Sequence, residues 1–129
     1  MSQPKQPPGR ARSPEREAAI RAALAELREE YRQITPGQLR ELGALIEQAR
    51  RGEAAAEALP QARMLAHRIR GTAGSYGWAP VGEAAGRIED ALLVAVERGG
   101  ALRDEEAAAI ARDLAEAEAA FAAPPETAS

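Results

Sequence analysis

The large apolar residues of this chain recur three and four positions apart from Ile20 to Phe121. This spacing is the period of an α-helix that buries one face. Alanine, which favours helices and disfavours strands, accounts for 32 of the 129 residues. No stretch of four or more residues alternates apolar and polar side chains with β-branched enrichment. The sequence therefore predicts an all-α fold with a core of mostly small side chains.

Proline and glycine divide this pattern into five amphipathic segments. Their apolar residues run over 20–34, 39–49, 62–76, 81–95 and 107–121. Ser13 and Pro14 predict the start of the first segment, and the capping-box sequence TPGQ at 35–38 predicts the start of the second. These two segments are either two helices or one helix kinked at Pro36. Because the last four segments are similar in length, we expect an antiparallel up-and-down four-helix bundle with an additional N-terminal helix.

The length of the chain fits one domain, which we expect to span residues 14–123. Residues 1–13 are rich in Pro, Gly and Ser and predict a disordered basic tail, and residues 124–129 predict a disordered C-terminal tail. The first 16 residues carry four basic side chains and one acidic, whereas the rest carries 13 basic and 19 acidic. A short basic tail beside an acidic body is a poor footprint for nucleic acid, so no nucleic-acid partner is expected.

The chain has no cysteine and a single histidine, His67. Disulfides, thiol catalysis and zinc–thiolate sites are thereby excluded, and we expect the chain to bind no metal or other cofactor. Its apolar runs are too short to span a membrane, and no secretory leader is recognisable. We therefore expect a cytoplasmic protein without a membrane partner, and a monomer as the default oligomeric state.

The segment from Ala66 to Trp78 displays the histidine on the outer face of a predicted helix. At about 100° per residue, Leu65, Ile69 and Tyr76 fall on one side and His67 roughly opposite. The residues that share the stripe of His67 are Arg63, Met64, Arg70, Gly71, Gly74 and, if the helix extends so far, Trp78. His67 is therefore predicted to face solvent.

Two glycines and an arginine beside His67 favour phosphoryl transfer. Gly71 and Gly74 each cost about 1 kcal/mol relative to alanine inside a helix, which suggests that a partner approaches closely there. Arg70 adds a permanent positive charge one turn away from a nucleophilic nitrogen, and phosphoryl transfer needs mainly alignment and charge stabilisation. The plainer alternatives are a surface histidine, glycines that pack against another helix and a solvated arginine.

A pattern of about 24 residues, which spans two predicted helices, resembles the histidine-containing phosphotransfer (HPt) domain. The residues that carry it are Ala66-His67, Arg70-Gly71, Gly74 and Gly77, then Val81, Ala85, Ile88 and Glu89. The resemblance implies that His67 accepts and donates the phosphoryl group. Arg70 stands where the family usually has lysine and would stabilise the charge. Around them, the partner-docking surface implied comprises Arg63, Met64, Arg68, Gly71, Gly74, Ser75 and Trp78.

The resemblance implies a stoichiometric phosphorelay intermediate of two-component signalling. It would take its phosphoryl group from a receiver aspartate or a histidine kinase and pass it to a response-regulator receiver aspartate. The receiver partner would bring Mg²⁺. No phosphate-binding loop is present, so no kinase activity of its own is expected. The alternative is a helical adaptor that docks on a receiver or kinase without carrying phosphate. A plain helical scaffold is a third possibility, which leaves Gly71 and Gly74 unexplained.

Overall fold

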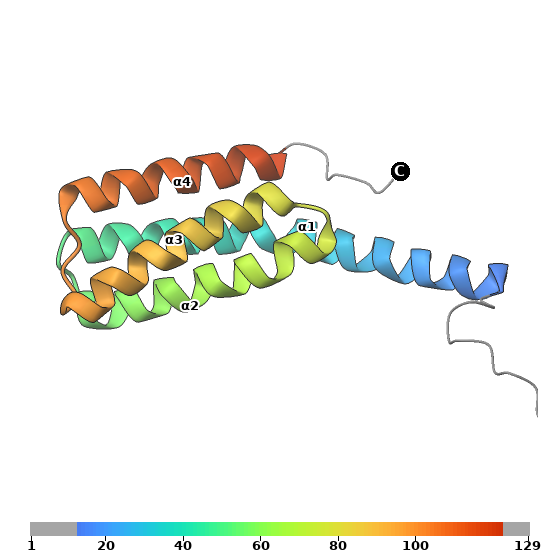
Figure 1. Cartoon of the computed structure of the whole chain (residues 1–129), viewed down its shortest axis with the longest axis horizontal. Helices are drawn as coiled ribbons and strands as arrows, with labels where there is room; N and C mark the ends of the chain where they lie inside the picture. Colours follow the sequence, from blue (N-terminus) through green and yellow to red (C-terminus); the bar gives the residue numbers. More distant parts are fainter. Residues whose placement is uncertain (1–12, 123–129) are drawn as a thin grey trace, which may run out of the picture.

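The computed structural model describes residues 13–122, and these are helical almost throughout. The elements are α1 (Pro14–Arg50), α2 (Ala55–Ala73), the short 3₁₀ turn η1 (Gly74–Tyr76), α3 (Ala79–Arg98) and α4 (Asp104–Ala122). No strand occurs within this range, so the predicted all-α class is confirmed for it. Figure 1 shows the four helices side by side, each running opposite to its neighbour in the chain.

The predicted tails lie almost wholly outside the described residues, as does Ala123 at the end of the predicted domain. Ser13 is the exception, because its Oγ accepts a hydrogen bond of 3.0 Å from the backbone N–H of Arg16 and caps the N-terminus of α1. Pro14 follows in the first turn, where its missing N–H costs no helical hydrogen bond.

The two N-terminal segments form one continuous helix, α1, with Pro36 inside it. The additional N-terminal helix of the predicted fold is therefore not a separate element. Thr35, expected to cap a new helix, is instead fully buried. Proline removes one intrahelical hydrogen bond and clashes with the preceding turn. The apolar residues on both sides of Pro36 pack on the bundle, which offsets that cost.

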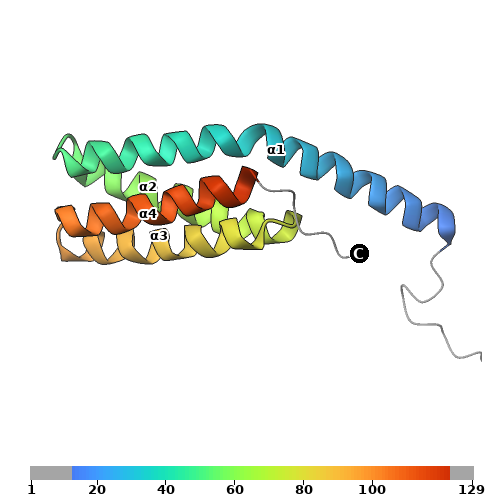
Figure 2. The same ribbon diagram turned by 90° about the horizontal axis from the view of Figure 1, so that it is seen from above.

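Only the second half of α1 belongs to the bundle. Its buried residues are Tyr31, Thr35, Leu39, Leu42, Ile46 and Ala49, whereas residues 13–27 are all exposed. Figures 1 and 2 show the first half projecting past the ends of the other helices, and Figure 2 shows it inclined to the packed half. We call residues 14–30 the arm.

Small side chains let the helices approach closely, above all α2 and α3. The largest fully buried side chains include Leu42, Leu59, Ile69, Ile88, Leu92 and Ile110, with alanines between them. At Gly82 of α3, an added Cβ would lie 3.4 Å from the carbonyl oxygen of Arg70 and 3.5 Å from the Cβ of Ala73. The backbone of α3 therefore lies so near α2 that a Cβ at position 82 would already be in van der Waals contact with it.

Aromatic side chains close the end of the bundle from which the arm projects. Trp78 and Tyr31 have ring centroids 5.2 Å apart, and Phe121 lies 5.3 Å from Trp78. Between α2 and Trp78 the chain turns through η1 and Gly77, whose φ of 96° lies in the left-handed region that favours glycine. This turn carries Trp78 inward, onto the core.

Candidate functional site

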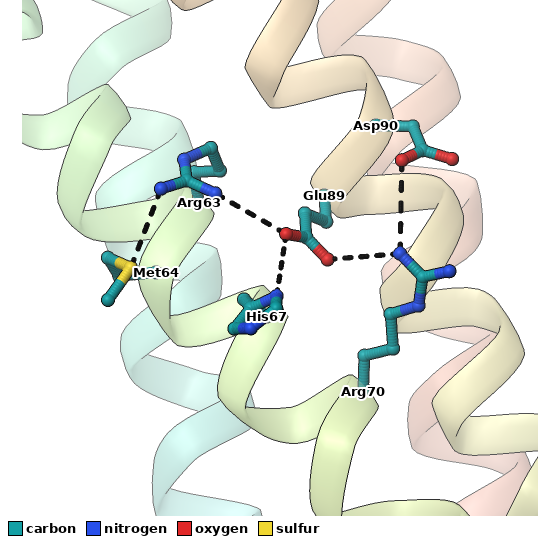
Figure 3. Close-up of polar contacts among 6 residues, drawn as sticks. All are labelled: Arg63, Met64, His67, Arg70, Glu89 and Asp90. Atoms are coloured by element: carbon teal, nitrogen blue, oxygen red, sulfur yellow. Dashed lines mark hydrogen bonds and ion pairs between the residues drawn. The ribbon is translucent and has the colours of Figure 1, made fainter.

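One face of α2 presents three basic side chains to α3. Arg63, His67 and Arg70 are four and three residues apart, so they lie above one another on the same side of the helix. Figure 3 shows all three side chains reaching towards a single residue of α3, Glu89. We call this region, together with Gly82 and Gly86 of α3, the α2–α3 seam.

Glu89 joins the three basic groups through its two carboxylate oxygens. His67 Nδ1 lies 2.8 Å from Glu89 Oε2, which also accepts a hydrogen bond of 3.4 Å from Arg63 Nη1. Arg70 Nη1 donates to Glu89 Oε1 at 3.2 Å and lies 4.0 Å from Asp90 Oδ1. One carboxylate thus fixes the relative positions of an imidazole and two guanidinium groups.

The carboxylate of Glu89 is nearly buried but stays ionised. Its side chain is 9% exposed, against 62% for His67. Burial acts to raise the pKa of Glu89, but the hydrogen bonds from His67 and Arg70 outweigh it and hold the pKa below its ordinary value. An anion paired in this way at the base of the site keeps the surrounding cations in place.

The contact with Glu89 determines which ring nitrogen of His67 is available. A carboxylate can only accept hydrogen bonds, so Nδ1 must carry the proton that lies between the two groups. In the neutral ring, Nε2 then holds the free lone pair. Because most of the side chain is exposed, Nε2 is the nitrogen that can act as a nucleophile towards a group arriving from solvent.

Gly86 provides the surface on which Arg70 rests. A Cβ at position 86 would lie 3.2 Å from Arg70 Nε and 3.4 Å from its Cδ, so any larger residue would press on the arginine side chain. Figure 3 shows the guanidinium on the Asp90 side of Glu89, away from the imidazole ring. In the resting structure, Arg70 therefore pairs with acidic side chains of α3.

Gly71 and Gly74 continue the His67 face towards the C-terminal end of α2. A Cβ added at either position would meet nothing within 4 Å, so neither glycine is needed for packing within the described residues. Close packing between helices, the alternative explanation for these two glycines, is instead found at Gly82. The space beside His67 is open, and a shallow hollow lined by Arg70, Gly74, Gly82 and Gly86 adjoins it.

The remaining predicted docking residues fall into two groups. Met64 and Arg68 are exposed and line a hollow on the α1 side of α2, while Ser75 is exposed near Gly74. Trp78 is only 3% exposed and packs in the aromatic cluster, so its assignment to the docking surface is wrong. The predicted helical face does not extend to Trp78, because α2 ends at Ala73.

Glu89 belongs to the family pattern, but the sequence alone predicts no role for it. The position of Glu89 in the helical period nevertheless indicates that it is buried. Glu89 lies four residues after Ala85 and three before Leu92, both fully buried, and therefore on the core-facing side of α3. A carboxylate at such a position needs a partner, and the only histidine of the chain is a natural candidate.

Within residues 13–122 no group of three or more acidic or histidine side chains is arranged to hold a metal ion. No helix in this range is both long enough and apolar enough to span a bilayer.

A family model described as the Hpt domain matches residues 10–120. The match includes all of α1, α2 and α3 and all but the last two residues of α4, and it confirms the resemblance found in the sequence. Comparisons with curated proteins and with solved structures give no match.

Proposed function

Because the chain belongs to the Hpt domain family, whose members take part in two-component phosphotransfer, we propose that it is a phosphorelay intermediate carrying the phosphoryl group on His67. The donor is a receiver aspartate or a histidine kinase, and the acceptor is a response-regulator receiver aspartate. The observation that carries the proposal is the imidazole itself, held at Nδ1 by Glu89 and open to solvent at Nε2.

In the accepting step, the lone pair of Nε2 attacks the phosphorus of an aspartyl phosphate. An N–P bond forms while the P–O bond to the aspartate breaks, and the aspartate leaves as a carboxylate. Nδ1 keeps its proton, so the ring gains positive charge, which the nearby Glu89 carboxylate stabilises. In the donating step, a second receiver aspartate attacks the phosphorus and Nε2 is the leaving atom.

Arg70 and the glycines serve the transfer in different ways. Arg70 is 52% exposed, so its guanidinium has room to turn from Glu89 and Asp90 towards a phosphoryl group on Nε2. Gly71 and Gly74 leave room for the receiver to bring its aspartate to the imidazole. Arg63, Met64, Arg68 and Ser75 surround this approach path. We expect the receiver to supply the Mg²⁺ that neutralises charge during transfer.

The direct test is transfer of labelled phosphate from a phosphorylated receiver domain to the full chain. We expect an acid-labile, base-stable label on the wild-type protein and none on His67→Ala. Glu57→Gln is a matched control, because Glu57 is exposed on the same helix, ten residues before His67 and away from the proposed docking residues. It should be labelled like the wild type.

Two results would contradict the proposal. A label that persists in His67→Ala would place the phosphoryl group on another residue. Failure of every receiver and kinase of the host to label the chain would leave docking without transfer, as in the adaptor alternative. In that case His67→Gln would bind the partner as tightly as the wild type.

A further inference from the structure

The arm carries an apolar stripe that nothing in the described residues covers. Ile20, Leu24 and Leu27 are 38%, 37% and 41% exposed, although each is a large aliphatic side chain. The stripe continues into the bundle at Tyr31, which is only 6% exposed because the rings of Tyr76, Trp78 and Phe121 pack against it. The same helical face is therefore buried in one half of α1 and exposed in the other.

The spacing of the stripe is that of a helix which packs on another helix. Ile20, Leu24, Leu27 and Tyr31 alternate steps of four and three, which is the repeat of a two-helix coiled-coil contact. A lone helix of the arm's length, about 25 Å at 1.5 Å per residue, is only marginally stable in water. A partner helix along the stripe would remove both the exposure and the marginal stability.

We propose that the occupant is a second copy of this chain, whose arm lies antiparallel along the first. The inference is independent of the proposed function, and it departs from the monomer expected from the sequence. In this arrangement Ile20 of one copy packs beside Leu24 of the other, and the reverse. Ala23, on the flank of the stripe, places no bulky side chain beside the contact.

The charges beside the stripe favour this partner and this direction. Arg16 and Glu30 lie on the same flank, two heptads apart, so antiparallel pairing sets each Arg16 opposite Glu30 of the second copy. Two ion pairs then form, against a single repulsive contact between the two Arg21 side chains on the other flank. Parallel pairing would instead set each Arg16 against Arg21 of the second copy, with no compensating attraction.

The contact between the two arms is small, so the association should be weak. Two arms of 17 residues bury less surface than the roughly 1,600 Å² of a standard stable interface. We therefore expect a reversible dimer whose population rises with concentration.

The first experiment measures the mass of the full chain by sedimentation equilibrium over a wide concentration range, up to about 1 mM. We expect a shift from monomer to dimer in the wild type. Leu24→Glu should weaken the dimer by about tenfold or more, because it places a charge in the centre of the contact. Ala22→Glu, with the same added charge on the opposite face of the arm, should dimerise like the wild type.

The second experiment tests the direction of the two arms by the sign of a charge change. Arg16→Glu should weaken an antiparallel dimer several-fold, and Arg16→Glu combined with Glu30→Arg should restore it. If Arg16→Glu tightens the dimer, the arms are parallel and the proposed arrangement is wrong. A single-chain mass at all concentrations, or equal behaviour of Leu24→Glu and Ala22→Glu, would overturn the dimer itself and leave the stripe to another occupant.

Discussion

The α2–α3 seam and the arm are made from the same kinds of residue, yet side chains of the seam make contacts across two helices, whereas the apolar side chains of the arm are exposed. Both are helical, rich in alanine and lined with arginine and glutamate. In the seam, a carboxylate buried at the helix contact holds two guanidinium groups and an imidazole in defined positions. In the arm, arginine and glutamate point to solvent and the apolar residues lie uncovered. Both regions are helical, so the difference between them lies in whether a neighbouring helix contacts their side chains.

The largest difference we predict is in stability. Ile88→Ala, which removes a fully buried side chain from α3, should lower the free energy of unfolding by about 3 kcal/mol. Leu24→Ala in the arm should lower it by less than about 0.5 kcal/mol, since that side chain has few neighbours to lose. Urea denaturation at low protein concentration measures both. Equal losses would mean that the arm is packed in solution.

The next effect isolates the carboxylate that orders the seam. Glu89→Gln should slow phosphotransfer about ten- to a hundred-fold, because an amide holds the Nδ1 proton less firmly and does not stabilise a charged imidazole. The rate of label transfer from a phosphorylated receiver is the measurement. Glu97→Gln, at an exposed position of the same helix, is the control. An unchanged rate in Glu89→Gln would make the contact with His67 irrelevant to transfer.

A smaller effect tests whether Gly86 positions Arg70. Gly86→Ala should raise the free energy of unfolding by up to about 1 kcal/mol, because alanine favours the helix, while transfer slows several-fold as the new Cβ displaces Arg70. In an Arg70→Ala background, Gly86→Ala should slow transfer little further, because Gly86 acts through its contact with Arg70. Val94→Ala, at an exposed position of α3, is the control. Fully additive effects would show that Gly86 acts independently of Arg70.

The smallest effect concerns an ion pair outside both regions. Hydrogen bonds from Arg98 and the backbone of Arg103 lower the pKa of Glu106 from 4.5 to about 2. This contribution to stability is complete above pH 4.5 and is lost as the pH falls towards 2. Over this interval, the melting temperature of Glu106→Gln should therefore fall by about 2 °C less than that of the wild type. Glu26→Gln in the arm should leave the profile unchanged, since Glu26 has no ion pair within residues 13–122.

Patterns that depend on one helix could be predicted from the sequence, and contacts between helices mostly could not. The outward position of His67 and the buried positions of Val81, Ala85 and Ile88 follow from helical period alone, and the structure agrees with them. Whether Pro36 separates two helices or lies within one could not be decided from the sequence. The capping-box sequence before residue 39 indicates a helix start, and only packing on the bundle keeps Pro36 within one helix.

The errors at Trp78 and Glu89 have the same physical origin. The α2 period, extended past Ala73, predicts an outward Trp78, but η1 and Gly77 change the chain direction and turn the indole inward. The sequence alone predicts no role for Glu89, because its importance depends on how close α3 lies to α2, and the two backbones are close at Gly82. A single helix pattern contains no information about the separation of two helices.

The aromatic cluster gives the molecule an optical probe of its own. Trp78 is the only tryptophan in the chain, and it lies with Tyr31 where the arm meets the bundle. Arg32, on the same helix as the arm, lies 5.7 Å from the centre of its ring. The fluorescence of the unlabelled protein therefore originates at this junction, and any event that loosens the root of the arm should change its wavelength or its quenching.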